Sequence, residues 1–321
     1  MTQEKQAPVG RLEKKKEHYL PRRFLERFTK NGRFTVALQR KDGSFKLLSN
    51  QKPDNHGYAT YLYETSASAD VGKGEYLFPN EIENALQKVE VKLFGDLERC
   101  ESKLRSDPGS LSEDDVDSIC CTVSFLISHL MARAPSSIAN SRQEKGRWLN
   151  AMKECGLSTH QELAELYRDA TGEPLGERYC LEPGQVAEHA SVDFNLNLSG
   201  VKQELLPYSD TGFFFRDIVG RDFEFLFTVE EHPFVGISLP RLMGAESDGI
   251  TPKEVYFPLS STLAVICSRG RGKRLSTRVL QAGEVRFFNT ISASMIGWDM
   301  AFCENDATMR GLSWGNRDIV K

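Results

Sequence analysis

The apolar residues between positions 80 and 133 recur every three or four residues, the spacing of one face of an α-helix. Asn80 can cap the first helix, with Glu83 completing a capping box. A second helix is predicted to begin after Ser112, which has Asp115 three residues later, and to run to about Arg133. The apolar stripe of the first helix consists of Ile82, Leu86, Val89, Leu93, Leu97, Cys100 and Leu104.

Strand-like patterns lie on either side of these helices. The run from Phe34 to Ser49 has two β-rich halves around Asp42 and Gly43, which predicts a hairpin. Further helices are expected over 138–154 and 159–170. Past residue 200 the sequence predicts strands at 223–229, 235–239, 255–259, 263–268 and 298–303. Helices in the middle and strands in the last third predict an α+β fold, with an N-terminal β-hairpin, a central helical bundle and a C-terminal mainly antiparallel sheet.

The sequence predicts one folded domain with short tails. Residues 1–12 are polar and predicted to be disordered, residues 13–305 form the α+β domain, and residues 306–321 form a C-terminal tail whose packing the sequence leaves open. The most apolar helical stretch, Cys120 to Ala132, is shorter than the ~20 residues that span a bilayer, so no membrane segment is expected. The seven cysteines include no C-x-x-C pair, which indicates reduced thiols and a cytoplasmic protein.

Several common catalytic motifs are absent from the sequence. It contains no G-x-S-x-G, no H-E-x-x-H and no G-x-G-x-x-G between a predicted strand and helix. The segment 270–274 fails the phosphate-loop pattern, because Cys267 occupies the required glycine position and Arg274 replaces Ser or Thr. None of the six histidines is paired at a metal-ligand spacing. With no nucleotide or zinc motif, the cofactor stays unknown.

Positive charge is concentrated in two basic islands. Residues 11–34 carry a net charge of +6 and residues 268–278 a net charge of +5. Because the whole chain has a net charge of −4, the remaining residues carry −15. Clustered cations attract nucleic acid or another anionic partner, whereas the alternative is a basic N-terminus and a solvated turn. The candidate binding residues are Arg22, Arg23, Arg269, Arg271, Lys273 and Arg274.

Glu83 and Glu90 are seven residues apart on one side of the first long helix. Such a carboxylate pair could bind a hard cation such as Mg²⁺ or act as acid and base. The alternative is structural, since Glu83 also suits the capping box and Gln87 can hydrogen-bond to either glutamate.

The N-terminal stretch KEHYLPRRFLERF, residues 16–28, resembles the opening K-x-H-Y-[VL]-P-x-x-[FY]-L-x-x-F signature of the domain of unknown function 4238 (DUF4238) family. Shorter similarities follow in order over residues 13–303. They are Glu83 and Glu90, Arg133-Ala134-Pro135, the FTVEEHP run from Phe227 to Pro233, the YFPLS run from Tyr256 to Ser260, and Asn289. Ala134 stands where the family has a hydroxyl residue, and Glu231-His232 where it has Asp-Asn. The family name assigns no activity.

His18 is the first catalytic candidate, because it titrates near neutrality and precedes Arg22 and Arg23, which could hold a phosphate. The alternative is that His18 locks the N-terminal segment by hydrogen bonds. Glu231 lies with His232 at the end of an apolar strand.

The resemblance adds Arg133 and Asn289 to His18 and Glu231 as a catalytic set. If these four residues converge, they suit phosphodiester cleavage, with a base on the nucleophile and an arginine on the developing phosphate charge. The leading hypothesis is therefore a phosphate- or nucleic-acid-directed, nuclease-like enzyme. The alternatives are a non-catalytic protein that grips an anionic partner through its basic islands, and a scaffold that binds protein through an apolar patch. Phe213-Phe214-Phe215 could stack on bases or be buried.

Overall fold

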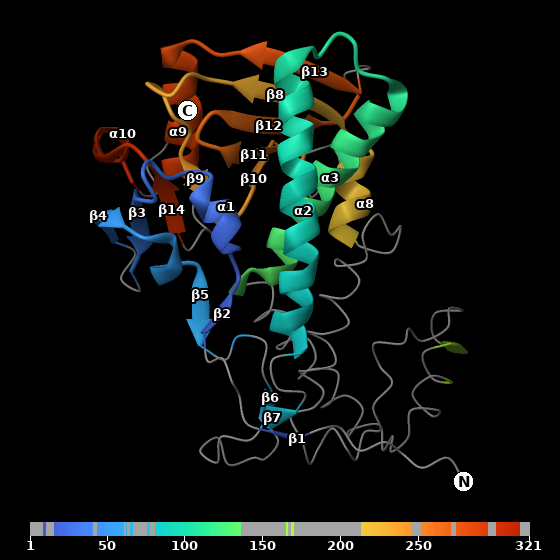
Figure 1. The fold of residues 1–321 in the computed structure, drawn as a ribbon, viewed down its shortest axis with the longest axis vertical. Helices are drawn as coiled ribbons and strands as arrows, with labels where there is room; N and C mark the ends of the chain where they lie inside the picture. The colour runs from blue at the N-terminus through green and yellow to red at the C-terminus, as the bar shows by residue number, and fades with distance from the viewer. Residues whose placement is uncertain are drawn as a thin grey trace. The chain divides into compact units, whose positions relative to one another are not determined.

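The computed structural model describes residues 9–10, 16–40, 44–60, 62, 65–66, 76–77, 81–135, 165, 168–169, 213–244, 252–270, 274–294 and 300–314. The chain divides into two compact units. The first unit comprises Met1–His18, Tyr58–Val89 and Pro135–Leu206. The second unit comprises Tyr19–Gly57, Glu90–Ala134 and Pro207–Lys321. The observed elements confirm the α+β class, including the N-terminal hairpin and the C-terminal sheet (Figure 1).

The first unit contains short antiparallel strand pairs. β2 (Lys16–His18) pairs with β5 (Tyr58–Thr60). β1 (Val9–Gly10), β7 (Tyr76–Leu77) and β6 (Thr65–Ser66) form a small sheet in that order. Val9 and Gly10, which lie in the segment predicted to be a disordered tail, pair with Leu77 and Tyr76. These partners are 66 or more residues away, so the local sequence does not reveal them.

The two long helices follow their predicted apolar stripes. α2 (Glu81–Ser106) buries five residues of the stripe: Leu86, Leu93, Leu97, Cys100 and Leu104. α3 (Glu113–Arg133) begins at the predicted capping box, in which the Ser112 hydroxyl accepts from the Asp115 N–H at 3.2 Å and the Asp115 carboxylate accepts from the Ser112 N–H at 3.3 Å. The expected helix at 138–154 lies outside the described residues, as do Asn80 and most of 159–170, where Glu165, Arg168 and Asp169 are helical.

α3 is long and apolar enough to cross a membrane by length and composition, and 61% of its most apolar window is buried inside the protein. Its serines are satisfied within the helix, because the Ser124 and Ser128 hydroxyls donate to the carbonyls of Cys120 and Ser124 at 2.7 and 2.8 Å. In this chain the apolar face of α3 is therefore part of a protein core.

The second unit holds two sheets. One has the order β4 (Phe45–Gln51), β3 (Phe34–Gln39), β14 (Met300–Cys303) and β9 (Gly236–Ile237). The other has the order β10 (Arg241–Met243), β11 (Glu254–Ser260), β12 (Leu263–Ser268), β8 (Asp222–Phe227) and β13 (Leu275–Val279). Its strands pair antiparallel except β13, which runs parallel to β8 (Figure 1).

α9 (Ala282–Ser294) packs on the five-stranded sheet, where Val285 and Phe288 join a buried cluster with Leu226 and Tyr256. The sequence did not predict α9, β13 or α8 (Phe213–Val219). β13 directly follows the basic turn, and the charged residues there are typical of a loop. The segment is nevertheless a strand, because it pairs with β8.

The residues after Asn305 pack onto the four-stranded sheet. α10 (Asp306–Arg310) buries Met309 completely, and the Asp306 carboxylate accepts hydrogen bonds from the hydroxyls of Thr35, at 2.9 Å, and Ser49. The Trp314 indole N–H donates to the Met309 carbonyl at 3.0 Å. Residues 306–314 of the predicted tail are therefore part of the fold.

The N-terminal motif places two phenylalanines in an aromatic core. α1 (Arg22–Glu26) carries Phe24, whose ring stacks on Phe257 at 5.5 Å between centroids, and Phe28 meets Phe302 edge to face at 5.0 Å. All four rings are fully buried. The motif thus joins α1 to β11 and β14.

Gly236 permits this aromatic core to close. A Cβ atom built on Gly236 would lie 2.3 and 2.8 Å from two atoms of the Phe302 ring and 2.9 Å from the Phe28 ring. Real Cβ atoms do not approach other atoms that closely, so only glycine lets β9 pass beside the rings.

We expect Gly236→Ala to destabilise the protein by about 1–3 kcal/mol, because the methyl group must displace buried rings. The matched control is Gly95→Ala in α2, where an added Cβ meets nothing within 4 Å and where alanine should stabilise the helix by about 0.5–1 kcal/mol. Urea unfolding of both variants measures this difference. Equal unfolding midpoints for Gly236→Ala and the parent protein would contradict the packing argument.

Candidate functional site

His18 lies on β2 in the first unit, beside the buried Glu83 carboxylate. The His18 Nδ1 atom is 3.7 Å from Glu83 Oε1, and the Gln87 amide donates to the same oxygen at 3.5 Å. The His18 ring also meets Tyr58 edge to face, with centroids 5.8 Å apart. The His18 ring therefore lies beside both Glu83 and Tyr58, and the predicted glutamine contact is confirmed for Glu83.

The buried Arg133 forms an ion pair with the partly buried Glu90 in the second unit. Arg133 Nη1 donates to Glu90 Oε1 at 2.5 Å and contacts His129 Nε2 at 2.9 Å. A guanidinium only donates, so His129 Nε2 is the acceptor and the imidazole is neutral with its proton on Nδ1. Burial, followed by the charge of Arg133, lowers the pKa of His129 well below its ordinary value. Arg133 is 1% exposed and serves to hold α3 against α2.

The predicted Mg²⁺ site at Glu83 and Glu90 gains no support from the structure. Each carboxylate already has a basic partner, His18 for Glu83 and Arg133 for Glu90. Within the described part of the chain, no three His, Cys, Asp or Glu side chains are grouped so that they could hold a metal ion.

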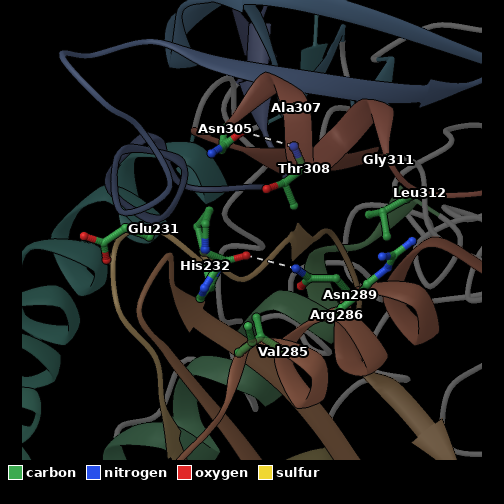
Figure 2. A pocket seen from close by; sticks show the side chains of 12 residues that line it. Glu231, His232, Val285, Arg286, Asn289, Asn305, Ala307, Thr308, Gly311 and Leu312 are labelled. Carbon is green, nitrogen blue, oxygen red and sulfur yellow. Dashed lines mark hydrogen bonds between the residues drawn. The ribbon is translucent and has the colours of Figure 1, made fainter.

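A pocket of about 460 Å³ lies in the second unit between the turn after β8, one face of α9 and the segment around α10. Figure 2 shows α10 on one side of this pocket and α9 on the other. Its polar lining residues are Glu231, His232, Arg286, Asn289, Asn305 and Thr308. Two of the four predicted catalytic residues, Glu231 and Asn289, therefore line one pocket. Arg133 is not among the lining residues, and His18 belongs to the other unit.

Asn289 holds the pocket wall in place. Its Oδ1 accepts from the Val235 N–H at 2.8 Å and its Nδ2 donates to the Pro233 carbonyl at 2.9 Å (Figure 2). The side chain is 3% exposed. Asn289 thus satisfies the buried backbone on both sides of Phe234, and it fixes the turn that carries His232.

His232 and Arg286 are the residues best placed to meet a ligand. The Thr228 hydroxyl donates to the His232 carbonyl at 2.9 Å, and the His232 N–H donates to Val229, so the turn is well fixed. Neither the imidazole nor the Arg286 guanidinium has a side-chain hydrogen bond or ion pair among the described residues. The Glu231 carboxylate lies at the rim and points away from Asn289 (Figure 2).

Arg286 was not predicted from the sequence. His232 was noted only as the neighbour of Glu231, which was the catalytic candidate. Ala282, Val285, Arg286 and Asn289 line the pocket at helical spacings of three, one and three residues. That spacing could have identified Arg286 as a pocket residue. It indicates a shared face only if the segment is helical, and α9 was not predicted.

Most described cations of the basic islands are paired with carboxylates. Arg22 Nε lies 2.7 Å from Glu26 and 3.0 Å from Asp54. Arg269 pairs with Asp217 at 2.5 Å.

Arg274 donates to the Val219 carbonyl at 2.8 Å and lies 3.5 Å from Asp117. Arg23 is exposed, and Arg271 and Lys273 lie outside the described residues. Phe215 is buried, which supports an anchoring role for that residue of the Phe213–Phe215 run.

The neutral, buried His129 predicts a pH dependence of stability. The pKa of His129 in the folded state lies below the unfolded value of about 6.5. Below that pH the unfolded protein binds a proton that the folded protein does not. The free energy of unfolding therefore falls as the pH drops below about 6.5, by up to ~1.4 kcal/mol per pH unit. His129→Gln keeps an acceptor for Arg133 but does not titrate. We expect its unfolding free energy to depend less steeply on pH than that of the parent between pH 7 and 5, as measured by urea unfolding. Parallel curves for the two proteins would show that His129 is not neutral in the fold.

No protein-family model, curated protein or solved structure matches this chain. The similarity to the DUF4238 family therefore stays a prediction from the N-terminal motif.

Proposed function

We propose that this chain is a phosphate-directed enzyme whose site is the pocket between the turn after β8, α9 and α10. The observation that carries the proposal is that Arg286 and His232 line one pocket of about 460 Å³. A volume of that order suits a small ligand. An unpaired guanidinium recognises phosphate oxygens by charge and by its planar set of donors.

The proposal gives the pocket residues the roles that the sequence assigned to His18 and Arg133. Arg286 holds the phosphate and stabilises the charge that develops on it. In hydrolysis, the oxygen of a water molecule bonds to phosphorus, the ester P–O bond breaks, and the leaving oxygen gains a proton. His232 accepts the proton from the attacking water and returns one to the leaving oxygen, as imidazoles do near neutral pH. Asn289 acts as a positioning residue for His232.

The alternative, a non-catalytic protein that grips a polyanion through the basic islands, has less support. Arg22, Arg269 and Arg274 each lie within 3.5 Å of a carboxylate. A polyanion would have to displace these partners, which reduces the gain from binding.

We expect inorganic phosphate to bind the parent protein and Arg286→Gln to weaken that binding by about 10-fold or more, since hydrogen bonds to charged groups contribute ~1.5–3 kcal/mol. Isothermal titration calorimetry measures the affinity at low and high salt. Arg22→Gln is the matched control, because Arg22 lies outside the pocket. No phosphate binding by the parent protein, or equal weakening by the two variants, would overturn the pocket as the site.

We expect His232→Asn to reduce hydrolysis of p-nitrophenyl phosphate by about 10²–10⁴-fold while phosphate still binds, because a general acid–base contributes about that much to a rate. Release of p-nitrophenol measures the rate, and His18→Ala is the comparison. Loss of activity in His18→Ala alone would assign the chemistry to His18. Binding of labelled single-stranded RNA that Arg22→Gln with Arg23→Gln abolishes, without any hydrolysis, would favour the gripping protein.

A further inference from the structure

The two sides of the pocket differ in charge. The side formed by α9 and the turn after β8 carries Arg286, His232 and Glu231. The opposite side is formed by residues 305–312, and the residues that it contributes to the lining are uncharged: Asn305, Ala307, Thr308, Gly311 and Leu312.

The charged residues of α10 are used elsewhere. Asp306 accepts from Thr35 and Ser49, and its second oxygen accepts from Arg310 Nε at 2.6 Å. Arg310 also donates to the Ser49 hydroxyl at 3.1 Å. These contacts turn both charges of the helix toward β3 and β4. The α10 side therefore offers a ligand two polar groups, Asn305 and Thr308, among apolar surface.

The Oδ1 atom of Asn305 is already used, since it accepts from the Thr308 N–H at 3.1 Å to cap α10 (Figure 2). Two further lining residues, Pro233 and Val285, are apolar and buried. Leu312 faces the same space as Arg286 (Figure 2).

We propose that the ligand of this pocket is a phosphate monoester of an uncharged, largely apolar group, with the phosphate on Arg286 and the apolar group against Leu312, Val285 and Pro233. The inference rests on the proposed function, because it takes phosphate binding at Arg286 as given. A second charged group on the ligand would be desolvated against the α10 side without a partner, which is unfavourable. An apolar group there gains from leaving water.

The test compares three probes by titration calorimetry: inorganic phosphate, phenyl phosphate and phosphoglycolate, which carries a carboxylate in place of the ring. We expect phenyl phosphate to bind on the order of 10-fold more tightly than inorganic phosphate, given the apolar area that a ring buries. Phosphoglycolate should bind no more tightly than inorganic phosphate.

Leu312→Ser should reduce the advantage of phenyl phosphate over inorganic phosphate several-fold while leaving the affinity for inorganic phosphate within about 2-fold. The matched control is Leu242→Ser on β10, an exposed leucine outside the pocket lining, which should change neither affinity. Asp306→Ala frees α10 from β3 and β4, and it should also reduce that advantage.

The outcomes separate the two proposals. If inorganic phosphate does not bind the parent protein, the proposed function fails. If inorganic phosphate binds in a manner that depends on Arg286, but phenyl phosphate binds no better or phosphoglycolate binds as well as phenyl phosphate, the proposed function stands and the apolar phosphate monoester is wrong.

Discussion

The close packing of Phe302 against Gly236 is the constraint on which the second unit depends. The Phe302 ring contacts Phe24, Phe28 and Phe34 edge to face, with centroids 5.0–6.0 Å apart. Aromatic pairs of this kind contribute about 0.5–1.5 kcal/mol each beyond their buried area. The cluster joins α1, the N-terminal hairpin and β14, and Gly236 lets β9 complete the same sheet. The turn before β9 carries His232, so the aromatic core also determines where the candidate site lies.

Several arginines of the described residues are paired with carboxylates, whereas Arg286 of the pocket is not. Arg133 is buried with Glu90, and Arg27 pairs with Glu101 while donating to the Leu259 carbonyl at 2.7 Å. Removing Glu90 would leave the charge of the buried Arg133 side chain in the interior without its partner, which costs about 3–5 kcal/mol. Arg286 differs, since it lies at a pocket without a carboxylate partner among the described residues. A cation in that setting can bind an anion without first giving up a partner.

The candidate site shows where reasoning from sequence succeeds and where it stops. Glu231 and Asn289, both chosen from the sequence, line one pocket, and the Asn289 side chain holds the backbone of Pro233 and Val235. Arg133 was chosen because Arg133-Ala134-Pro135 is similar to the R-[TS]-P helix end of the DUF4238 family, but in the structure Arg133 is paired with Glu90. Charge and position in the sequence do not reveal whether an arginine faces a carboxylate or a pocket, because the partner comes from a distant segment.

The elements whose signals are local could be predicted from the sequence alone. The α2 and α3 helices follow from their apolar spacing and from the Ser112 and Asp115 capping box, and the hairpin of β3 and β4 follows from two β-rich runs around a turn. The short elements β1, β13 and α10 depend on the tertiary structure, because partners far along the chain stabilise them. The pocket depends on it as well, because residues 231–233, 282–289 and 305–312 come from segments far apart in the sequence. Local patterns fix secondary structure, whereas long-range packing and the pairing of charges fix the site.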